Sequence, residues 1–228
     1  MIDGVSYYRV AINLPIGESL SDIKLCVTLS LDGKTLEFNW TLNVLSYAKA
    51  VMNGDFDDVT KTLMKDMLVY ANAAYTYFEN TLEAEKLSEV AALLEGYTKE
   101  IPTGEAKKPT DTTYFKDVTV NLDKVPSFKF TLAEGYTADD FTFKVGNRSA
   151  TVIAGEGYVE IVMYAYRMLE DVTFTVKETD VTESYNLYAY YEYAKTLNNA
   201  NLTAIVEALM KYSVSAADYR NTVIGSNK

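Results

Sequence analysis

Tyrosine is the residue type with the most binding chemistry to offer in this sequence. The chain has 19 tyrosines in 228 residues and one tryptophan. A tyrosine ring has an apolar face and a polar hydroxyl, which suits both sugar rings and protein partners. We single out five tyrosines as candidate ligand-binding residues: Tyr158, Tyr164, Tyr166, Tyr188 and Tyr191.

The first three of these tyrosines belong to the segment "YVEIVMYAYRM" (158–168). Period-two alternation places Val159, Ile161 and Met163 on one face of a strand, which we expect to be core. The tyrosines then share the opposite face with Glu160. Either this face binds a glycan or a protein, or helices cover it and the tyrosines fill the interface.

The sequence has few residues suited to catalysis or metal binding. The chain has no histidine, the commonest general base near neutral pH and the commonest zinc ligand. Paired carboxylates could still cleave glycosides, but among 32 acidic residues no pair stands out, so we expect a non-enzyme. We read "GDFDD" (54–58) as helix capping rather than as a metal site. We expect neither a metal nor a cofactor, and a buried, inert thiol at Cys26.

Charge and hydropathy limit the classes of partner that the chain can bind. The net charge of −11 disfavours nucleic acid and anionic lipid. No apolar run approaches the roughly 18 residues that a membrane span needs, so we expect no membrane insertion. The opening "MIDGVSYYRV" lacks the pattern of a signal peptide.

The sequence of the elements that position these residues occurs in two similar copies. The phrase "MLVYANAAYTYF" (67–78) returns as "LMKYSVSAADYR" (209–220), 142 positions later. Apolar residues at spacings of four and three predict an amphipathic helix in both places. The two stripes are Leu63, Met67, Tyr70, Ala74 and Tyr77, then Ile205, Leu209, Tyr212, Ala216 and Tyr219.

Upstream segments match in the same order. "NVLSY" (43–47) corresponds to "NLYAY" (186–190), with Asn43 and Asn186 as helix caps. "LSDIKLCV" (20–27) corresponds to "LEDVTFTV" (169–176), and "RVAINLP" (9–15) to "YVEIVMY" (158–164). We therefore predict an internal duplication. The alternative is two unrelated amphipathic helices that converged.

Two related modules follow. We predict an α+β fold in which each module is a small antiparallel sheet or sandwich packed against a helix pair. In the first, Asp32-Gly33 predicts a tight hairpin turn. "TLEFNWTL" (35–42) alternates, and we expect its apolar face, with Trp40, to be core. The second module has additional strands in front, so the first is abbreviated at its amino-terminal end.

The expected organisation has two modules and a linker. The first module spans 1–99, with three strands and helices near 43–54, 57–80 and 82–98. A linker, 100–112, is rich in Pro, Thr, Lys and Gly. The second spans 113–228, with helices near 186–197 and 200–220.

This pattern resembles a repeated accessory module of large secreted or cell-surface proteins of anaerobic gut and rumen Firmicutes, which carry dockerins, degrade glycans or act as adhesins. The resemblance covers nearly all of 113–222 and about half of the first copy. The matching residues are Asn43, Val44, Tyr47, Leu68, Tyr70, Ala73, Ala74 and Tyr77, then Asn186, Leu187, Tyr190, Leu209, Tyr212, Ala216, Ala217 and Tyr219. The first copy lacks the opening strands and has Asn where Ser is usual.

The resemblance implies an extracellular, non-catalytic module that accompanies neighbouring domains of a larger chain. Three functions stay open on sequence grounds. The first is an accessory module that contacts a polysaccharide or a surface protein through its tyrosines. The second is a purely structural spacer. The third and remotest is a carboxylate-dependent glycosidase.

Overall fold

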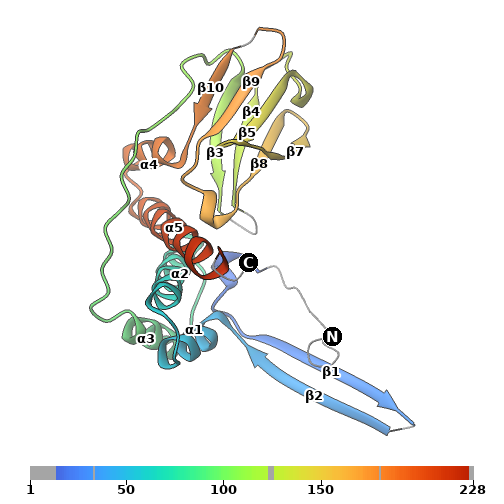
Figure 1. Ribbon diagram of the computed structural model, residues 1–228, viewed down its shortest axis with the longest axis vertical. Coiled ribbons are helices and arrows are strands. Elements are labelled where there is room, and N and C mark those ends of the chain that lie inside the picture. The colour runs from blue at the N-terminus through green and yellow to red at the C-terminus, as the bar shows by residue number, and fades with distance from the viewer. Residues whose placement is uncertain (1–13, 33, 123–125, 180, 226–228) are drawn as a thin grey trace.

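The computed structural model describes residues 14–32, 34–122, 126–179 and 181–225 (Figure 1). It shows an α+β protein with three antiparallel sheets, which confirms the predicted fold class. A β-sandwich lies at one end, helices form the middle layers, and a two-stranded hairpin projects from the helical end. The pairing of Val10 and Ile12 with the later strand lies outside the described residues.

The first half of the chain is a hairpin followed by helices. Its elements are η1 (Ile16–Glu18), β1 (Ile23–Leu31), β2 (Lys34–Leu42), α1 (Val44–Asn53), α2 (Asp58–Tyr77) and α3 (Ala84–Leu93). Helices α1 and α2 lie where the sequence predicts them, whereas α3 ends at Leu93 rather than near residue 98. Asn43 caps α1 by accepting from the Ser46 amide at 2.6 Å, and Asp57 caps α2 by accepting from the Thr60 amide at 2.7 Å.

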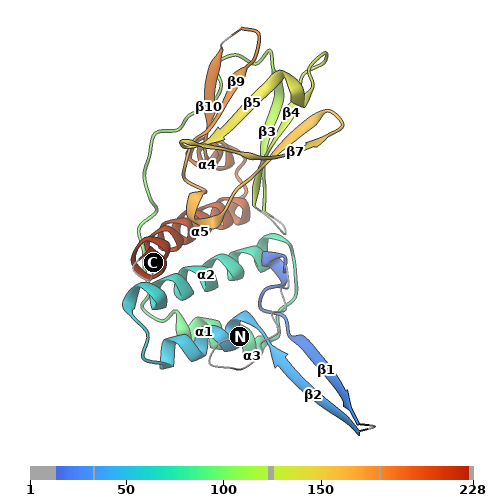
Figure 2. The same ribbon diagram turned by 45° about the vertical axis from the view of Figure 1, so that its right-hand side comes forward.

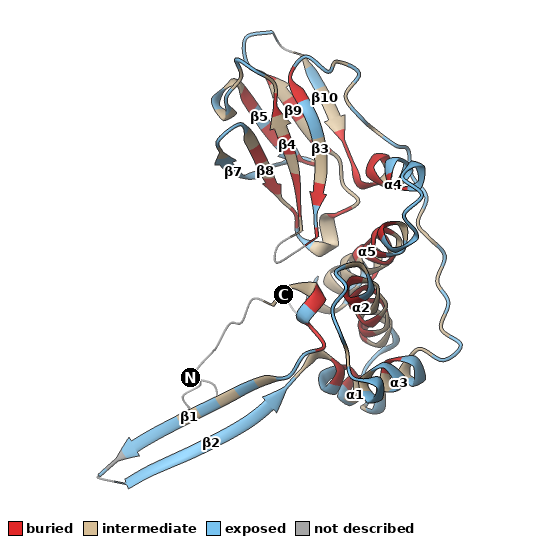
Figure 3. Ribbon diagram, turned by 180° about the vertical axis from the view of Figure 1, so that it is seen from behind, coloured by how far each residue is buried: buried red, intermediate tan, exposed pale blue. Residues whose placement is uncertain are grey.

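The β1–β2 hairpin departs from the prediction. Its residues are almost all exposed (Figure 3). Trp40 and Phe38 have 48% and 40% of their surface exposed, so the expectation that this face is core is wrong. Cys26, expected to be buried, is exposed on the other face. Alternation correctly predicts two faces, but here no described element covers the apolar one.

The second half builds the sandwich and a second helix pair. Its strands are β3 (Phe115–Asn121), β4 (Ser127–Leu132), β5 (Phe141–Val145), β6 (Arg148–Ser149), β7 (Thr151–Gly155), β8 (Tyr158–Val162), β9 (Val172–Val176) and β10 (Thr182–Tyr185). The helical elements are η2 (Ala138–Asp140), η3 (Ala165–Arg167), α4 (Leu187–Thr196), α5 (Ala200–Tyr219) and η4 (Arg220–Ile224).

The sandwich has two sheets that share an aromatic core. Their strand orders are β3-β4-β8-β7 and β10-β9-β5-β6. Phe174 of β9 lies 4.8 Å from Phe115 of β3 between ring centroids, and Phe130 lies 5.1 Å from Phe115. As predicted, Val159 and Ile161 of β8 are fully buried. Alternating inward residues from both sheets therefore form one hydrophobic layer.

The two long helices that carry the repeated phrase pack against each other (Figure 2). The rings of Tyr70 on α2 and Tyr212 on α5 stack at 5.8 Å. Tyr70 and Ala74 belong to the hydrophobic core of the sandwich and α5, whereas other α2 residues, such as Leu68, pack with α1 and α3. Helix α2 thus contributes to both cores and joins the two halves.

The predicted linker contains neither helix nor strand, but it is tied down along its length. We call residues 94–114 the strap, because this segment runs in the open from α3 past α5 and α4 to β3 (Figure 1). The Lys107 amide donates to Asn186 Oδ1 at 3.1 Å, and the Asn186 amide returns a bond of 3.1 Å to the Lys107 carbonyl. The proposed module limits themselves stay a prediction.

The two halves share a sequence of elements. In each, a single-turn helix (η1 or η3) precedes an antiparallel strand pair, then a 10-residue helix, then a 20-residue helix. The junctions also match: Asn43 Nδ2 donates to Asp22 at 2.6 Å, and Asn186 Nδ2 donates to Asp171 at 2.9 Å. These are structural similarities, and the duplication itself stays a prediction.

Candidate functional site

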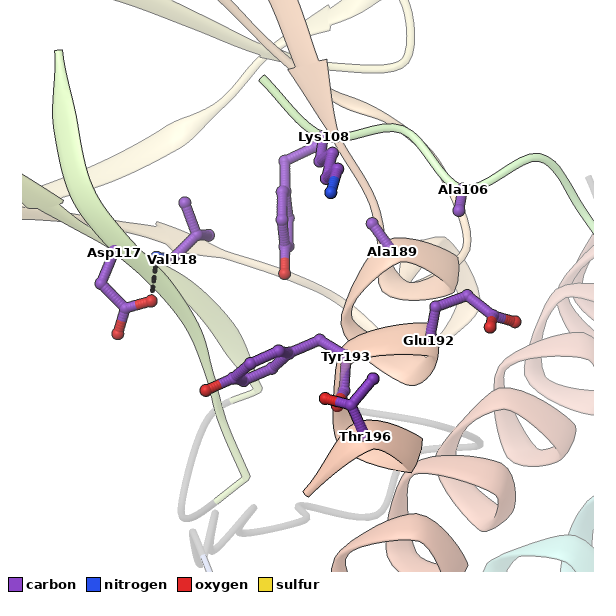
Figure 4. A pocket seen from close by; sticks show the side chains of 9 residues that line it. Ala106, Lys108, Asp117, Val118, Ala189, Glu192, Tyr193 and Thr196 are labelled. Atoms are coloured by element: carbon purple, nitrogen blue, oxygen red, sulfur yellow. Dashed lines mark hydrogen bonds between the residues drawn. The ribbon is translucent and has the colours of Figure 1, made fainter. Parts of the chain in front are cut away.

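A groove between β3, α4 and the strap is the best candidate for a ligand site (Figure 4). Its volume is about 540 Å³, within the usual range of small-molecule sites. The lining residues are Ala106, Lys108, Asp117, Val118, Tyr185, Ala189, Glu192, Tyr193 and Thr196. The groove therefore combines aromatic rings with a carboxylate, an ammonium group and a hydroxyl.

Tyr193 and Tyr185 supply the aromatic surface of the groove. Tyr193 projects from α4 toward β3 with 49% of its surface exposed. Tyr185 ends β10 and is buried, and its ring packs edge-on against Phe128 at 5.7 Å. Burial, and then the nearby charges of Tyr190, Asp117 and Tyr193, raise the pKa of Tyr185 well above its ordinary value. The Tyr185 hydroxyl thus stays protonated and can donate a hydrogen bond.

The charged groups of the groove have different freedom. Asp117 Oδ1 accepts from the Val118 amide at 2.8 Å, which orients the carboxylate beside Tyr193. Lys108 lines the groove from the strap. Glu192 turns away from the groove in Figure 4 and accepts from Lys195 at 2.7 Å, so it contributes mainly its aliphatic stem.

The five tyrosines predicted from the sequence do not form one surface. Strand β8 ends at Val162, so the expected tyrosine ladder is broken: Tyr158 begins the strand, and Tyr164 and Tyr166 follow it at η3. Tyr158 lies on the sheet face with the Lys129 ammonium 4.1 Å from its ring centre. Tyr158 is thus separated from the other two by the length of β8.

Tyr164 and Tyr166 are the two predicted tyrosines whose rings stack on each other. Their rings stack at 5.6 Å, with the Arg220 guanidinium 4.0 Å from the Tyr166 ring centre. Tyr164 remains 57% exposed.

On α4, Tyr191 and Tyr188 already have partners within the chain. The Tyr191 hydroxyl donates to Glu207 at 2.6 Å, and the Tyr188 ring packs on Gly104 of the strap.

Sequence reasoning missed the groove. Tyr193 lies three residues after Tyr190 and four after Ala189 on α4, so its place beside the buried face was readable from helical spacing. The proximity of Asp117 and Lys108 to Tyr193 could not be predicted, because both residues lie more than 70 positions before Tyr193 in the sequence.

A second polar cluster has a structural character. Asp66 on α2 is fully buried and accepts from Lys99 Nζ at 2.6 Å and from the Tyr97 hydroxyl at 2.8 Å. Ser215 on α5 also donates to Asp66 and lies 2.5 Å from Lys99 Nζ. Burial, and then the bond to Asp66, raise the pKa of Tyr97. The cluster joins α2, α5 and the strap.

Searches for related proteins identify no family for the chain. No family model matches it, and neither the curated proteins nor the solved structures include a significant match. Among the described residues, no group of three or more Cys, Asp or Glu side chains could hold a metal ion. No helix within the described ranges is both long and apolar enough to cross a membrane.

Proposed function

We propose that this chain is a non-catalytic accessory module of a bacterial secreted or cell-surface protein, and that it binds a neutral sugar unit in the groove beside α4. One observation carries this proposal: the half-exposed Tyr193 ring stands beside the Asp117 carboxylate, in a groove that the buried Tyr185 also lines. An aromatic face can stack on the C–H face of a sugar, while a carboxylate and an ammonium group can bond its hydroxyls.

The charge of the molecule favours a neutral ligand. The net charge of −11 repels polyanions. In the groove, Asp117 offers an acceptor, and Lys108 and Tyr185 offer donors. This set matches a polyol, whose hydroxyls both donate and accept.

The test is a screen of soluble polysaccharides and oligosaccharides by affinity electrophoresis, followed by calorimetry with the best ligand. Tyr193→Ala and Asp117→Asn should each weaken binding by about tenfold or more, since a stacked ring or a charge-assisted hydrogen bond is worth about 1–3 kcal/mol. Tyr164→Ala is the matched control, because Tyr164 is an exposed tyrosine that does not line the groove.

The results separate the candidate functions. No retardation by any glycan would contradict sugar binding. Binding that survives the groove variants but is lost in Tyr164→Ala would move the site to the stacked Tyr164–Tyr166 pair. Released reducing sugar that one carboxylate substitution abolishes would instead support a glycosidase.

A spacer role is the second candidate, and the packing of α2 on α5 favours it. The stacked Tyr70 and Tyr212 and the buried Asp66 cluster connect the two halves through side chains rather than through the strap alone. A spacer of this kind holds its neighbours at a constant distance. Solution scattering profiles that stay the same with and without glycan, together with no glycan affinity, would favour this role.

A further inference from the structure

The β1–β2 hairpin exposes one continuous apolar face. Cross-strand pairs place Leu25 beside Trp40, Val27 beside Phe38 and Leu29 beside Leu36. The described apolar residues on this face are Ile23, Leu25, Val27, Leu29, Leu36, Phe38, Trp40 and Leu42. The Phe38 and Trp40 rings stack at 5.7 Å and 7°. Exposed apolar faces of this kind mark interaction sites in soluble proteins.

The corresponding hairpin in the second half has the same kind of face, but that face is buried. Val172 and Phe174 of β9 are fully buried, and Val176 is 5% exposed. The sheet of β3, β4 and β8 covers them, and β5 pairs with the free edge of β9. Among the described residues, no third strand pairs with β1 or β2.

Both hairpins are attached to their helices in the same way. The residue just before each strand pair, Asp22 or Asp171, binds the Asn that caps the following helix. Each of these carboxylates also pairs with a lysine: Lys86 at 2.9 Å for Asp22, and Lys107 at 2.6 Å for Asp171. The β1–β2 hairpin is therefore joined to its helix by the same contacts as the β9–β10 hairpin.

We propose that the apolar face of β1–β2 docks on an antiparallel β-sheet like that of β3, β4, β8 and β7. Such a partner has phenylalanine and valine at alternate inward positions, and an open edge strand equivalent to β5. The docked hairpin would become the edge of a second sandwich, with Trp40 and Phe38 in its core. In a second copy of this chain, the sheet of β3, β4, β8 and β7 is already covered by that copy's own β9–β10. A second copy is therefore not the occupant we propose.

The test supplies such a sheet from the chain itself. Residues 113–163 are fused before Met1 of the full chain, because these strands precede η3 in the second half. Trp40 is the only tryptophan, so its fluorescence reports on this face alone. In the fusion, Trp40 emission should shift to shorter wavelength, and amide exchange over 23–42 should slow by at least about tenfold.

Two controls match this experiment. The same fusion with Phe128→Ser and Phe130→Ser in the added copy only should leave Trp40 exposed, because both side chains face the core of the sandwich. Cys26, on the polar face, should stay reactive toward a thiol reagent in every variant. If Cys26 reactivity fell while Trp40 emission shifted to shorter wavelength, both faces would be covered. That result would indicate aggregation rather than docking and would count against the proposal.

Three results would overturn the proposal. One is a fusion in which Trp40 emission and amide exchange over 23–42 are those of the parent chain. This result counts even if the added strands are disordered, because the same strands do fold when β9–β10 covers them. The second is a parent chain that is dimeric by light scattering and becomes monomeric on Phe38→Ser, which would assign the face to a second copy. The third is a parent chain in which Phe38→Ser clearly lowers the denaturant concentration at the midpoint of unfolding, as expected only of a covered core residue.

Discussion

Tyr190 shows what a tyrosine does when it belongs to the core of this protein. It lies on the buried face of α4, with its ring centre 6.3 Å from that of Tyr193. Burial, followed by the nearby charge of Tyr77, raises the pKa of Tyr190 to about 12. The neighbouring Tyr193 is half exposed, so two tyrosines one helical turn apart have different roles.

This pKa gives the stability of the protein an alkaline limit. The folded state favours the neutral phenol of Tyr190, so its contribution is complete below the ordinary pKa of 10.0 and is lost as the pH rises toward about 12. We expect the free energy of unfolding to fall over this window in urea titrations. In Tyr190→Phe, the free energy of unfolding should fall less steeply with pH. An equal slope in both proteins would show that Tyr190 does not titrate with unfolding.

At the scale of elements, the two helix caps are related but unequal. Asn43 lies at the surface, where it accepts from the Ser46 amide and binds Asp22. Asn186 is 2% exposed, and besides accepting from the Ala189 amide and binding Asp171, it bonds the strap at Glu105 and Lys107. The second cap therefore has more buried hydrogen bonds to lose.

Alanine substitution should reveal this difference. Asn43→Ala should lower the free energy of unfolding by about 1 kcal/mol, the usual cost of a lost cap. Asn186→Ala should cost about 2–4 kcal/mol, because buried partners on the strap are left unpaired as well. Chemical denaturation measures both. Equal losses would mean that the strap contacts of Asn186 contribute nothing.

The helices and their caps could be predicted from the sequence because their signals are local. Asn43 and Asn186 stand directly before apolar stripes, and Asp32 before Gly33 indicates the hairpin turn. In the structure Asp32 has a positive φ of 50°, as such a turn requires. The exposure of Trp40 could not be predicted, because alternation does not tell whether another sheet covers a face. The tyrosine ladder failed because alternation continues past Val162, where the strand ends.

At the scale of the whole molecule, the Asp66 cluster brings together three distant parts of the chain. It joins α2, the strap and α5 through Lys99 and Ser215, 33 and 149 positions from Asp66. Nothing in the local sequence indicates these partners. The cluster holds the helices of the first half against those of the second, so the halves should unfold together.

Removing the Asp66 carboxylate should therefore affect the entire protein. Asp66→Ala leaves the Lys99 ammonium without its buried partner, which typically costs about 3–5 kcal/mol. We expect calorimetry to show a lower melting temperature, still with one transition, because Tyr70 and Ala74 keep α2 in the core of the second half. Asp218→Ala, an exposed carboxylate on α5, is the control and should change stability by less than about 0.5 kcal/mol. An unchanged melting temperature in Asp66→Ala would show that the cluster contributes nothing to holding the halves together.

The strap has a mechanical consequence. A pull that separates the two halves would load residues 94–114 as well as the α2–α5 contact, and this segment contains no helix or strand to unravel. The first side-chain bonds to carry tension would be those near the two ends of the segment, from the Tyr97 hydroxyl to Asp66 and from the Thr110 amide to Glu183. Stretching of this segment should therefore meet resistance until these side-chain bonds break.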